Sequence, residues 1–270
     1  MGAKVLVTDM DGTLLNSRKE ISAATKEAIG DILRRGHKVI LASGRPTPGM
    51  RPYESELELE KYGGYLMSFN GARIVECNTG EIIYQRTLPS VLLPELYRFA
   101  REAECGLATH LGNEAISAFV PDRYITMEAH MNGMSVRMVE DFIDFVDFDV
   151  YKCLMTAEPA RAEVLEKQLQ DKFGHAASIY RSDPYFIEVM PPNVDKAASL
   201  ARMLEMIGME SADTVCCGDG YNDLSMIKCA GVGVAMGNAQ PEVKAAADYI
   251  TADNDSDGLA EAIRVLFAED

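Results

Sequence analysis

The chain has 270 residues, of which 47% are hydrophobic, so it is long enough for one or two domains with buried cores. Its formal net charge is -16, from 42 acidic and 26 basic residues, which argues against a nucleic-acid partner because such binding depends on Lys and Arg neutralising phosphates. The sequence opens directly on an apolar run and has no apolar window of about 18 residues, so we expect a cytoplasmic chain with no signal peptide and no contact with a membrane.

The first third of the sequence alternates short apolar runs with one amphipathic segment. Ser22 is a candidate N-cap for that segment and Gly36 a candidate end, which predicts a helix between two strands. A strand, helix, strand unit of this kind is typical of a parallel sheet. The expected elements are strands at residues 4–8, 38–42 and 65–69, a helix at 23–35, and a hairpin of 73–75 with 82–84.

The rhythm of the sequence changes at about Pro89. Helical spacing and strand-like runs then occur without a regular alternation, which predicts a mixed α and β insertion. The elements expected in it are helices at residues 92–104 and 162–173, two or three strands between those helices, one of them at 151–156, and later strands at 178–180 and 185–189.

The parallel pattern resumes after Pro191 and Pro192. The expected elements are helices at residues 196–207, 223–229, 241–247 and 258–267, and strands at 214–217, 232–235 and 249–251. The fold class is therefore α/β: a doubly wound, parallel, Rossmann-like core of residues 1–86 and 190–270, interrupted by an α/β cap of residues 87–189.

Polar turns follow the first, second and Cys217 strands of the predicted core. In doubly wound sheets, ligands bind outside the carboxyl ends of the strands, so these turns are expected to converge on one site. Asp9 and Asp11 lie in the first turn; one carboxylate can attack phosphorus while its neighbour serves as general acid and base. A calcium loop is the alternative for D-x-D-G, but the third acidic ligand it requires is replaced by Thr13.

The turn after the strand at residues 214–217 carries two more carboxylates, Asp219 and Asp223. Magnesium prefers oxygen ligands and often shares one or two carboxylates with a substrate phosphate, so Asp9, Asp219 and the backbone carbonyl of Asp11 would suffice to hold it. Asp223 either supports this metal site or stands at a helix N-terminus, where its charge offsets the macrodipole.

The turn after the second strand offers the hydroxyl of Ser43 and the backbone N–H of Gly44, which suit an anion. Alone, this segment is equally consistent with an ordinary turn. Lys196 is also weak evidence alone, since a Lys in the first helical turn is usually solvated. Its position, directly after the chain returns to the core, makes it a candidate.

Four segments in this order resemble the haloacid dehalogenase-like hydrolases, in particular the Cof-type sugar phosphatases: Asp9 to Leu14, Ser43 to Arg45, Lys196, and Gly218 to Asp223. The resemblance implies a magnesium-dependent phosphatase for small phosphate monoesters, with an aspartyl-phosphate intermediate. Ser43 stands where the family more often has Thr, and Ala197 where it more often has Gly.

The resemblance also implies a role for each matched residue. Asp9 would be the nucleophile, and Asp11 the acid that protonates the leaving oxygen and later activates water. Ser43, Gly44 and Lys196 would hold the phosphoryl group. Magnesium would be held by Asp9, Asp11 and Asp219. Support would come from Asn222 and Asp223. Arg45 would contact either the leaving group or the cap.

Two alternatives remain beside the phosphatase. A phosphomutase or phosphotransferase uses the same core, but the arginines of the insertion are spread out along the sequence and form no cluster that would recognise a bisphosphate. A non-catalytic sugar-phosphate-binding protein would have no use for Asp11 beside Asp9. The six cysteines include no C-x-x-C pair, so we expect reduced thiols and no zinc site. The expected partner is a small phosphorylated metabolite.

Overall fold

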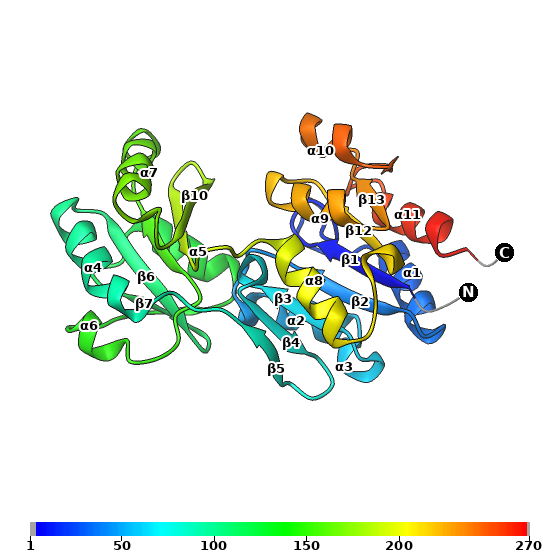
Figure 1. The fold of residues 1–270 in the computed structure, drawn as a ribbon, viewed down its shortest axis with the longest axis horizontal. Coiled ribbons are helices and arrows are strands. Elements are labelled where there is room, and N and C mark those ends of the chain that lie inside the picture. Colours follow the sequence, from blue (N-terminus) through cyan, green and yellow to red (C-terminus); the bar gives the residue numbers. More distant parts are fainter. Residues whose placement is uncertain (1–3, 269–270) are drawn as a thin grey trace. The chain divides into compact units, whose positions relative to one another are not determined.

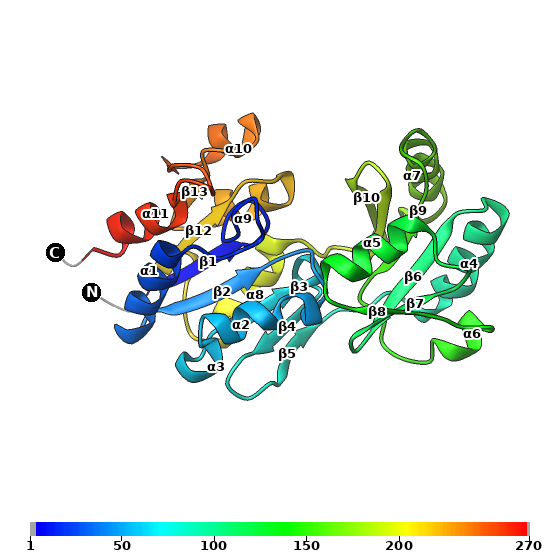
Figure 2. The same ribbon diagram turned by 180° about the vertical axis from the view of Figure 1, so that it is seen from behind.

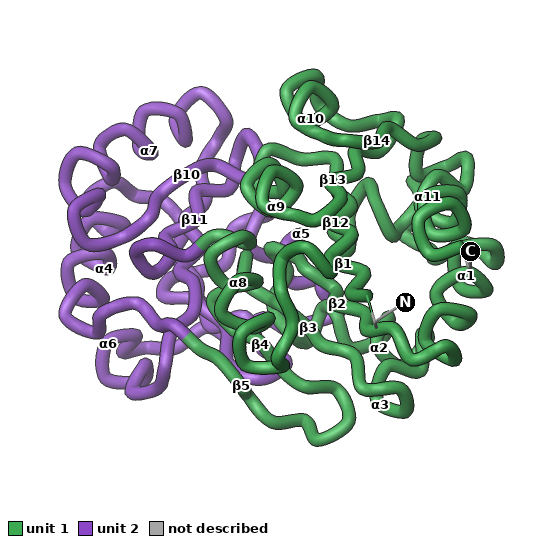
Figure 3. Tube along the Cα trace, turned by 45° about the vertical axis from the view of Figure 1, so that its right-hand side comes forward, with its two compact units in different colours: residues 1–85, 195–270 green, residues 86–194 purple. Residues whose placement is uncertain are grey.

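The computed structural model describes residues 4–268, whose contacts divide the chain into two compact units (Figure 3). The first unit is built from two stretches of sequence, one up to Gln85 and the other from Asp195 onward. The second unit is the single stretch Arg86–Val194. It spans the predicted insertion of residues 87–189 and extends it at both ends.

Within residues 4–268, the first unit contains an eight-stranded sheet of order β14-β13-β12-β1-β2-β3-β4-β5 (Figure 1). Six neighbouring strands, from β14 to β3, run parallel, whereas β4 pairs antiparallel with both β3 and β5. The strands are β1 (Val5–Asp9), β2 (Lys38–Ala42), β3 (Tyr65–Ser68), β4 (Arg73–Glu76), β5 (Ile82–Gln85), β12 (Thr214–Gly218), β13 (Val232–Ala235) and β14 (Tyr249–Ile250).

Helices cover both faces of this sheet (Figures 1 and 2). Alternate residues of a strand point to opposite faces, so Leu6 packs in a cluster with side chains of α1 and α11, whereas its neighbours Val5 and Val7 pack in a cluster with α8. The predicted doubly wound α/β core is thus confirmed. The helices of the unit are α1 (Ala23–Arg34), α2 (Arg51–Glu56), α3 (Leu59–Tyr62), α8 (Lys196–Met206), α9 (Leu224–Cys229), α10 (Pro241–Ala246) and α11 (Gly258–Leu266).

Two helix starts matter for the site. Asp195 caps α8 by accepting a hydrogen bond from the backbone N–H of Ala198, which places Lys196 at the first helical position. The helix predicted at residues 223–229 begins one residue later, at Leu224, after a 3-10 turn over Tyr221–Asp223. The difference arises because Asp223 folds back and accepts hydrogen bonds from the backbone of Asp219 and Gly220, at 3.1 and 2.9 Å.

The second unit has, in its described residues, a six-stranded sheet of order β10-β11-β9-β6-β7-β8. Cys153 and Met155 pack in a cluster with α4, α6 and α7, and Leu154 between them packs on the other face with Tyr124 of α5. The elements are α4 (Leu93–Glu102), β6 (Gly106–Leu111), β7 (Glu114–Ser117), α5 (Arg123–Met131), β8 (Ser135–Met138), α6 (Phe142–Phe145), β9 (Cys153–Thr156), α7 (Pro159–Phe173), β10 (Ser178–Asp183) and β11 (Phe186–Met190).

Four ionisable side chains are buried between α5 and this sheet, and we call them the buried ionisable cluster: His110, Glu128, Lys152 and Glu188. His110 Nε2 lies 3.1 Å from Glu128 Oε1, and Lys152 Nζ lies 3.2 Å from Glu188 Oε1 and 3.9 Å from Glu128 Oε1. The hydroxyl of Tyr180 donates to Glu188 Oε2 at 3.3 Å. Buried charged groups are tolerated only when they have hydrogen-bond or ion-pair partners. The contacts of Glu128 therefore hold α5 in one position on the sheet.

None of the helices in the described part of the chain is long and apolar enough to cross a membrane. Five of the six cysteines are buried and Cys229 is exposed. Burial raises the pKa of the Cys153 thiol to about 12, so that thiol stays protonated at neutral pH.

Candidate active site

The predicted site residues lie at the carboxyl ends of adjacent parallel strands. Strand β1 lies between β2 and β12, with Asp9 in register with Ala42 and Thr8 in register with Cys217. Asp9 ends β1, Ser43 follows β2, and Asp219 follows β12. The strand-end geometry therefore brings three separate turns to one edge of the sheet, as expected for this topology.

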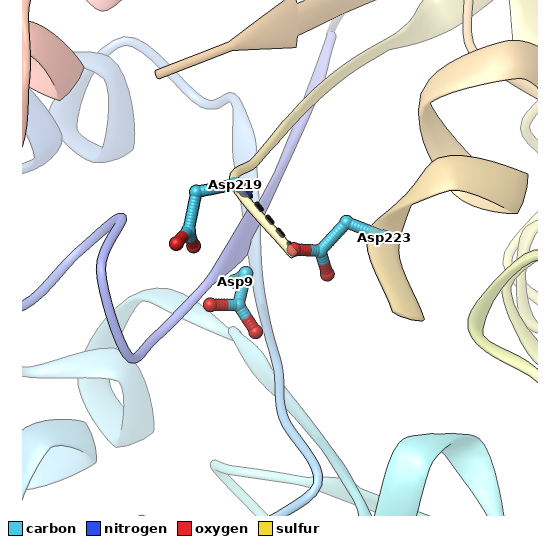
Figure 4. Close-up of side chains that lie close together, drawn as sticks. All are labelled: Asp9, Asp219 and Asp223. Carbon is cyan, nitrogen blue, oxygen red and sulfur yellow. Dashed lines mark hydrogen bonds between the residues drawn. The ribbon is translucent and has the colours of Figure 1, made fainter. Parts of the chain in front are cut away.

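Three carboxylates meet at this edge (Figure 4). Asp9, Asp219 and Asp223 each offer an oxygen, and these oxygens all lie within 4.8 Å of one another. Asp223 is fully buried and Asp9 is 6% exposed. Burial and the neighbouring Asp223 raise the pKa of Asp9 well above its ordinary value, although Lys196 opposes the shift.

Lys196 is the cation of this group. Its Nζ donates to Asp9 Oδ1 and to Asp223 Oδ1, both at 2.6 Å, and the residue is only 1% exposed. Burial favours the neutral amine, but Asp223 and Asp9 outweigh it and raise the pKa of Lys196. The lysine that the sequence placed in a helical first turn is thus a buried ammonium bridging two carboxylates.

The donor set fits a divalent cation. Lys196 offsets one of the three carboxylate charges, so full ionisation leaves two negative charges in the group that no cation neutralises. Burial and Asp223 raise the pKa of the half-buried Asp219 to about 6. A divalent cation would offset both charges, and carboxylate oxygens are the ligands that hard cations prefer. Both oxygens of Asp223 already accept hydrogen bonds, from Lys196 and from the backbone, which leaves Asp9 and Asp219 as the more open ligands.

Two residues that the sequence analysis assigned no role contact Asp219. Thr13 Oγ1 donates to Asp219 Oδ1 at 3.0 Å, and Asn238 Nδ2 donates to Asp219 Oδ2 at 3.4 Å and to the Gly12 carbonyl at 2.9 Å. Gly12 has φ +90, and a Cβ there would overlap the Asp219 carboxylate, so only glycine fits. Asn238 follows β13, and its place after a parallel strand was the available signal.

Asp11 is held by two cations rather than by the carboxylate group. Arg45 Nε and Nη2 donate to Asp11 Oδ2 and Oδ1 at 2.7 and 2.8 Å, and Lys19 Nζ donates to Oδ1 at 2.7 Å. Burial raises the pKa of Asp11, but the hydrogen bonds and charges of Arg45 and Lys19 outweigh it and lower that pKa to about 2. Nothing in the sequence pattern pointed to Lys19.

The turns after β2, β3 and β12 are tied together by Asn70. Its backbone N–H donates to the Ser43 carbonyl at 2.9 Å, its side chain accepts from Asn222 Nδ2 at 3.2 Å, and a Cβ on Gly44 would lie 3.2 Å from its amide. Asn70 has φ +52, a left-handed conformation that asparagine tolerates better than most residues. Asn70 thus contacts Ser43, Gly44 and Asn222 and links the turns that carry them.

Comparison with known proteins agrees with these motifs. The family model for haloacid dehalogenase-like hydrolases matches residues 6–263. The 5-amino-6-(5-phospho-D-ribitylamino)uracil phosphatase YcsE of Bacillus subtilis is 32% identical over 261 residues, which cover 97% of this chain and 94% of that protein.

Solved structures share the whole fold. A haloacid dehalogenase-like hydrolase from Bacteroides thetaiotaomicron is 43% identical with a TM-score of 0.95, covering 98% of this chain and 100% of that one. BT4131, described as a HAD subclass IIB sugar phosphatase, is 26% identical with a TM-score of 0.84, covering 98% and 99%. The chain therefore belongs to the haloacid dehalogenase-like hydrolases and is an enzyme of the family that includes these phosphatases.

Proposed function

We propose that this enzyme hydrolyses small phosphate monoesters, with sugar phosphates as the substrate class, through an aspartyl-phosphate on Asp9. The observation that carries the proposal is the contact of Asp9 with the buried ammonium of Lys196, beside two further carboxylates. A nucleophilic carboxylate that must meet an anionic phosphoryl group needs such a cation beside it. The family and its named phosphatases support the reaction class, and the sugar phosphatase BT4131 supports the substrate class.

The proposed metal is Mg²⁺, held by Asp9, Asp219 and the Asp11 backbone carbonyl, with Asp223 supporting. When bound, it would neutralise charge on the phosphoryl oxygens. Lys196, with Ser43 and Gly44, would bind the same phosphoryl group by charge and hydrogen bonds. The donor chemistry of the carboxylates supports this choice over zinc, which favours His and Cys ligands.

The proposed reaction has two displacements at phosphorus. In the first, an Asp9 oxygen bonds to phosphorus as the ester P–O bond breaks, and the departing oxygen takes a proton from Asp11. The anionic phosphate bound beside Asp11 would raise its pKa from the low value in the free site, which lets Asp11 hold that proton. In the second, water attacks the same phosphorus while Asp11 accepts its proton, which frees inorganic phosphate and regenerates Asp9. The second unit, residues 86–194, is proposed as the cap that selects the ester.

A phosphate-release screen tests the proposal, with phosphorylated sugars, polyols, nucleotides and cofactors, and with Mg²⁺ or excess chelator. We expect release from sugar phosphates that requires Mg²⁺. Asp9→Asn, whose amide cannot attack phosphorus, should lose at least about 10³-fold in kcat, equal to about 4 kcal/mol of transition-state stabilisation. Folding of that variant is checked by circular dichroism. Residual turnover above a tenth of the unmodified enzyme would remove Asp9 as the nucleophile.

A further inference from the structure

Lys19 is the most exposed of the three cations described above in the candidate active site. Its side chain is 53% exposed, whereas that of Arg45 is 10% exposed and that of Lys196 is fully buried. Lys19 Nζ donates to Asp11 Oδ1 at 2.7 Å, so this ammonium lies beside the turn that follows β1. A ligand in solution can reach it directly.

The Asp11 carboxylate has a complete partner without Lys19. Arg45 Nε and Nη2 donate to its two oxygens at 2.7 and 2.8 Å, a bidentate geometry. Two positive charges therefore meet one negative charge, and a surplus of positive charge remains. A lysine ammonium has three N–H donors, and in the described residues its hydrogen bond to Asp11 uses one of them. The other two donors of Lys19 are available to a ligand.

The turn that carries Lys19 is built by Asn16. Asn16 Oδ1 accepts from the backbone N–H groups of Arg18 and Glu20 at 2.9 and 3.0 Å. The Lys19 N–H donates to the Asn16 carbonyl at 2.9 Å, and the Tyr53 hydroxyl donates to the Lys19 carbonyl at 3.2 Å. These contacts hold the backbone at the base of the flexible Lys19 side chain.

Lys19 has a backbone conformation that lysine seldom adopts. Its φ is +61, in the left-handed region, where a residue with a Cβ is disfavoured and glycine is not. Unfavourable backbone conformations that the surrounding contacts maintain are concentrated at functional sites. Glycine would fit this turn at a lower free-energy cost, but it would remove the ammonium. The conformation therefore points to a role for the side chain.

We propose that Lys19 is a substrate-binding residue that donates a hydrogen bond to the sugar, at an oxygen on the carbon next to the one that carries the phosphate. This inference rests on the proposed function, which places the leaving group beside Asp11. Sugar and polyol phosphates carry a hydroxyl or a ring oxygen at that position, and both accept from an ammonium. Lys19 thus distinguishes sugar phosphates as a class from alkyl phosphates, and selection among sugars is left to residues 86–194.

Two esters with the same carbon chain test this contact. Glycerol 3-phosphate and propyl phosphate both release a primary alcohol, but only the first carries further hydroxyls. We expect the unmodified enzyme to have a roughly tenfold higher kcat/KM for glycerol 3-phosphate, because a hydrogen bond to a charged group contributes at least that much to binding. Lys19→Met should remove this preference through KM, and Lys19→Arg should keep part of it.

Inhibition constants give the same comparison if turnover of these esters is slow. Each ester is tested as a competitive inhibitor of p-nitrophenyl phosphate hydrolysis, and the two constants should differ in the unmodified enzyme but not in Lys19→Met. Lys61→Met removes an exposed lysine of α3, which pairs with Glu58, and is the matched control. It should keep the preference for glycerol 3-phosphate.

Stability distinguishes substrate binding from a structural role. Lys19→Gly removes the ammonium together with the unfavourable backbone conformation, and an exposed ion pair contributes little to stability. We expect the Tm of this variant to equal or exceed that of the unmodified enzyme, while its preference for glycerol 3-phosphate is lost. A lower Tm with an unchanged preference would make Lys19 a structural residue and overturn the proposal.

Three further results would overturn it: no preference in the unmodified enzyme, an equal rise in KM for both esters in Lys19→Met, or a lower kcat on both with unchanged KM. The second result would mean that Lys19 attracts any phosphate, and the third that it acts only through Asp11. If the proposed function itself is wrong, the unmodified enzyme releases no phosphate from any ester, or Asp9→Asn remains active.

Discussion

At the scale of single residues, the site is a balance of buried charges. The ammonium of Lys196 neutralises the charge of one carboxylate among Asp9, Asp219 and Asp223. The negative charge that remains would attract a further cation. The side chain of Asp11 is not part of this group, because Arg45 and Lys19 form ion pairs with it and neutralise its charge. The protein thus separates the carboxylates proposed for metal and nucleophile from the one proposed for proton transfer.

Metal binding should stabilise the fold through Asp219. A ligand that binds only the folded state at 100 times its Kd adds about 2.7 kcal/mol, so saturating Mg²⁺ should raise Tm by several degrees. Asp219→Asn should remove most of this rise, because it removes an open ligand and one of the uncompensated charges. Differential scanning calorimetry with and without Mg²⁺ measures it. Asp248→Asn, whose carboxylate accepts from the backbone of Gly233, is the control and should keep the full rise.

The sequence predicted which residues would come together at one edge of the sheet better than it predicted the contacts they make there. Strand-end turns and the D-x-D-G and G-D-x-x-N-D motifs pointed to Asp9, Asp11 and Asp219, since parallel strands present their carboxyl ends at one edge. Lys196 and Asp9 are 187 positions apart in the sequence, so their ion pair could not be predicted from sequence spacing. The two hydrogen bonds from the Arg45 guanidinium to the Asp11 carboxylate could not be predicted either, because they depend on the conformation of the turn after β2.

At the scale of elements, the strands and most helices of the core followed from periodicity, but the core helices α2 and α3 did not, and neither did α5 of the second unit. The segment Arg123–Met131 has a buried face on which Glu128 sits between apolar residues, so the apolar period expected of a helix is broken. The charge is tolerated because His110 and Lys152 meet it from the sheet. Neither partner could be matched to Glu128 from the sequence alone.

Removing Lys152, the lysine of the buried ionisable cluster, should destabilise the second unit. Lys152→Met leaves Glu128 and Glu188 buried without their ammonium, and breaking a buried pair costs about 3–5 kcal/mol. We expect lower stability in urea and faster amide exchange in α5. Lys167→Met removes an exposed lysine on α7 and is the control. Equal stability of the two variants would contradict the importance assigned to the cluster.

The same cluster predicts an acid limit for the second unit. Burial raises the pKa of Glu128, but His110 and Lys152 outweigh it and lower that pKa from 4.5 to about 2. The folded state therefore binds this proton less readily than the unfolded state. The resulting stability, about 3 kcal/mol, is present above pH 4.5 and is lost as the pH falls toward 2. Urea midpoints across this range, compared with those of Glu128→Gln, measure the difference; the variant should show a flatter profile.

At the scale of the whole molecule, chemistry and selection are proposed to reside in different units. Every residue assigned above to the reaction belongs to the first unit, whose boundaries are Gln85 and Asp195. Contacts to the part of the ester that does not react can raise kcat as well as affinity, and a cap can exclude water during the reaction.

Replacing residues 86–194 by a Gly/Ser linker should therefore separate the two tasks. We expect the remaining core, if it folds by circular dichroism, to keep weak Mg²⁺-dependent activity on a small aryl phosphate. Its kcat/KM values for different sugar phosphates should differ less than those of the full-length enzyme. Values of kcat/KM for several esters on both proteins measure this. A folded core that keeps the full-length ranking would place selection in the turns of the core, with Asn70 the first residue to examine.

The divided construction of the first unit has a consequence for how the chain folds as it leaves the ribosome. Strand β1 is the centre of its sheet, but its neighbour β12 begins at Thr214 and is synthesised about two hundred residues later. Until then one edge of β1 has no partner strand, and an unpaired edge invites association with other chains. Arg86–Val194, by contrast, is one continuous stretch that contains all the strands of its own sheet. The nascent chain thus carries β1 with one unpaired edge after all of the second unit has been synthesised, and Asp9, Asp219 and Asp223 can meet only once the segment that follows β12 has been made.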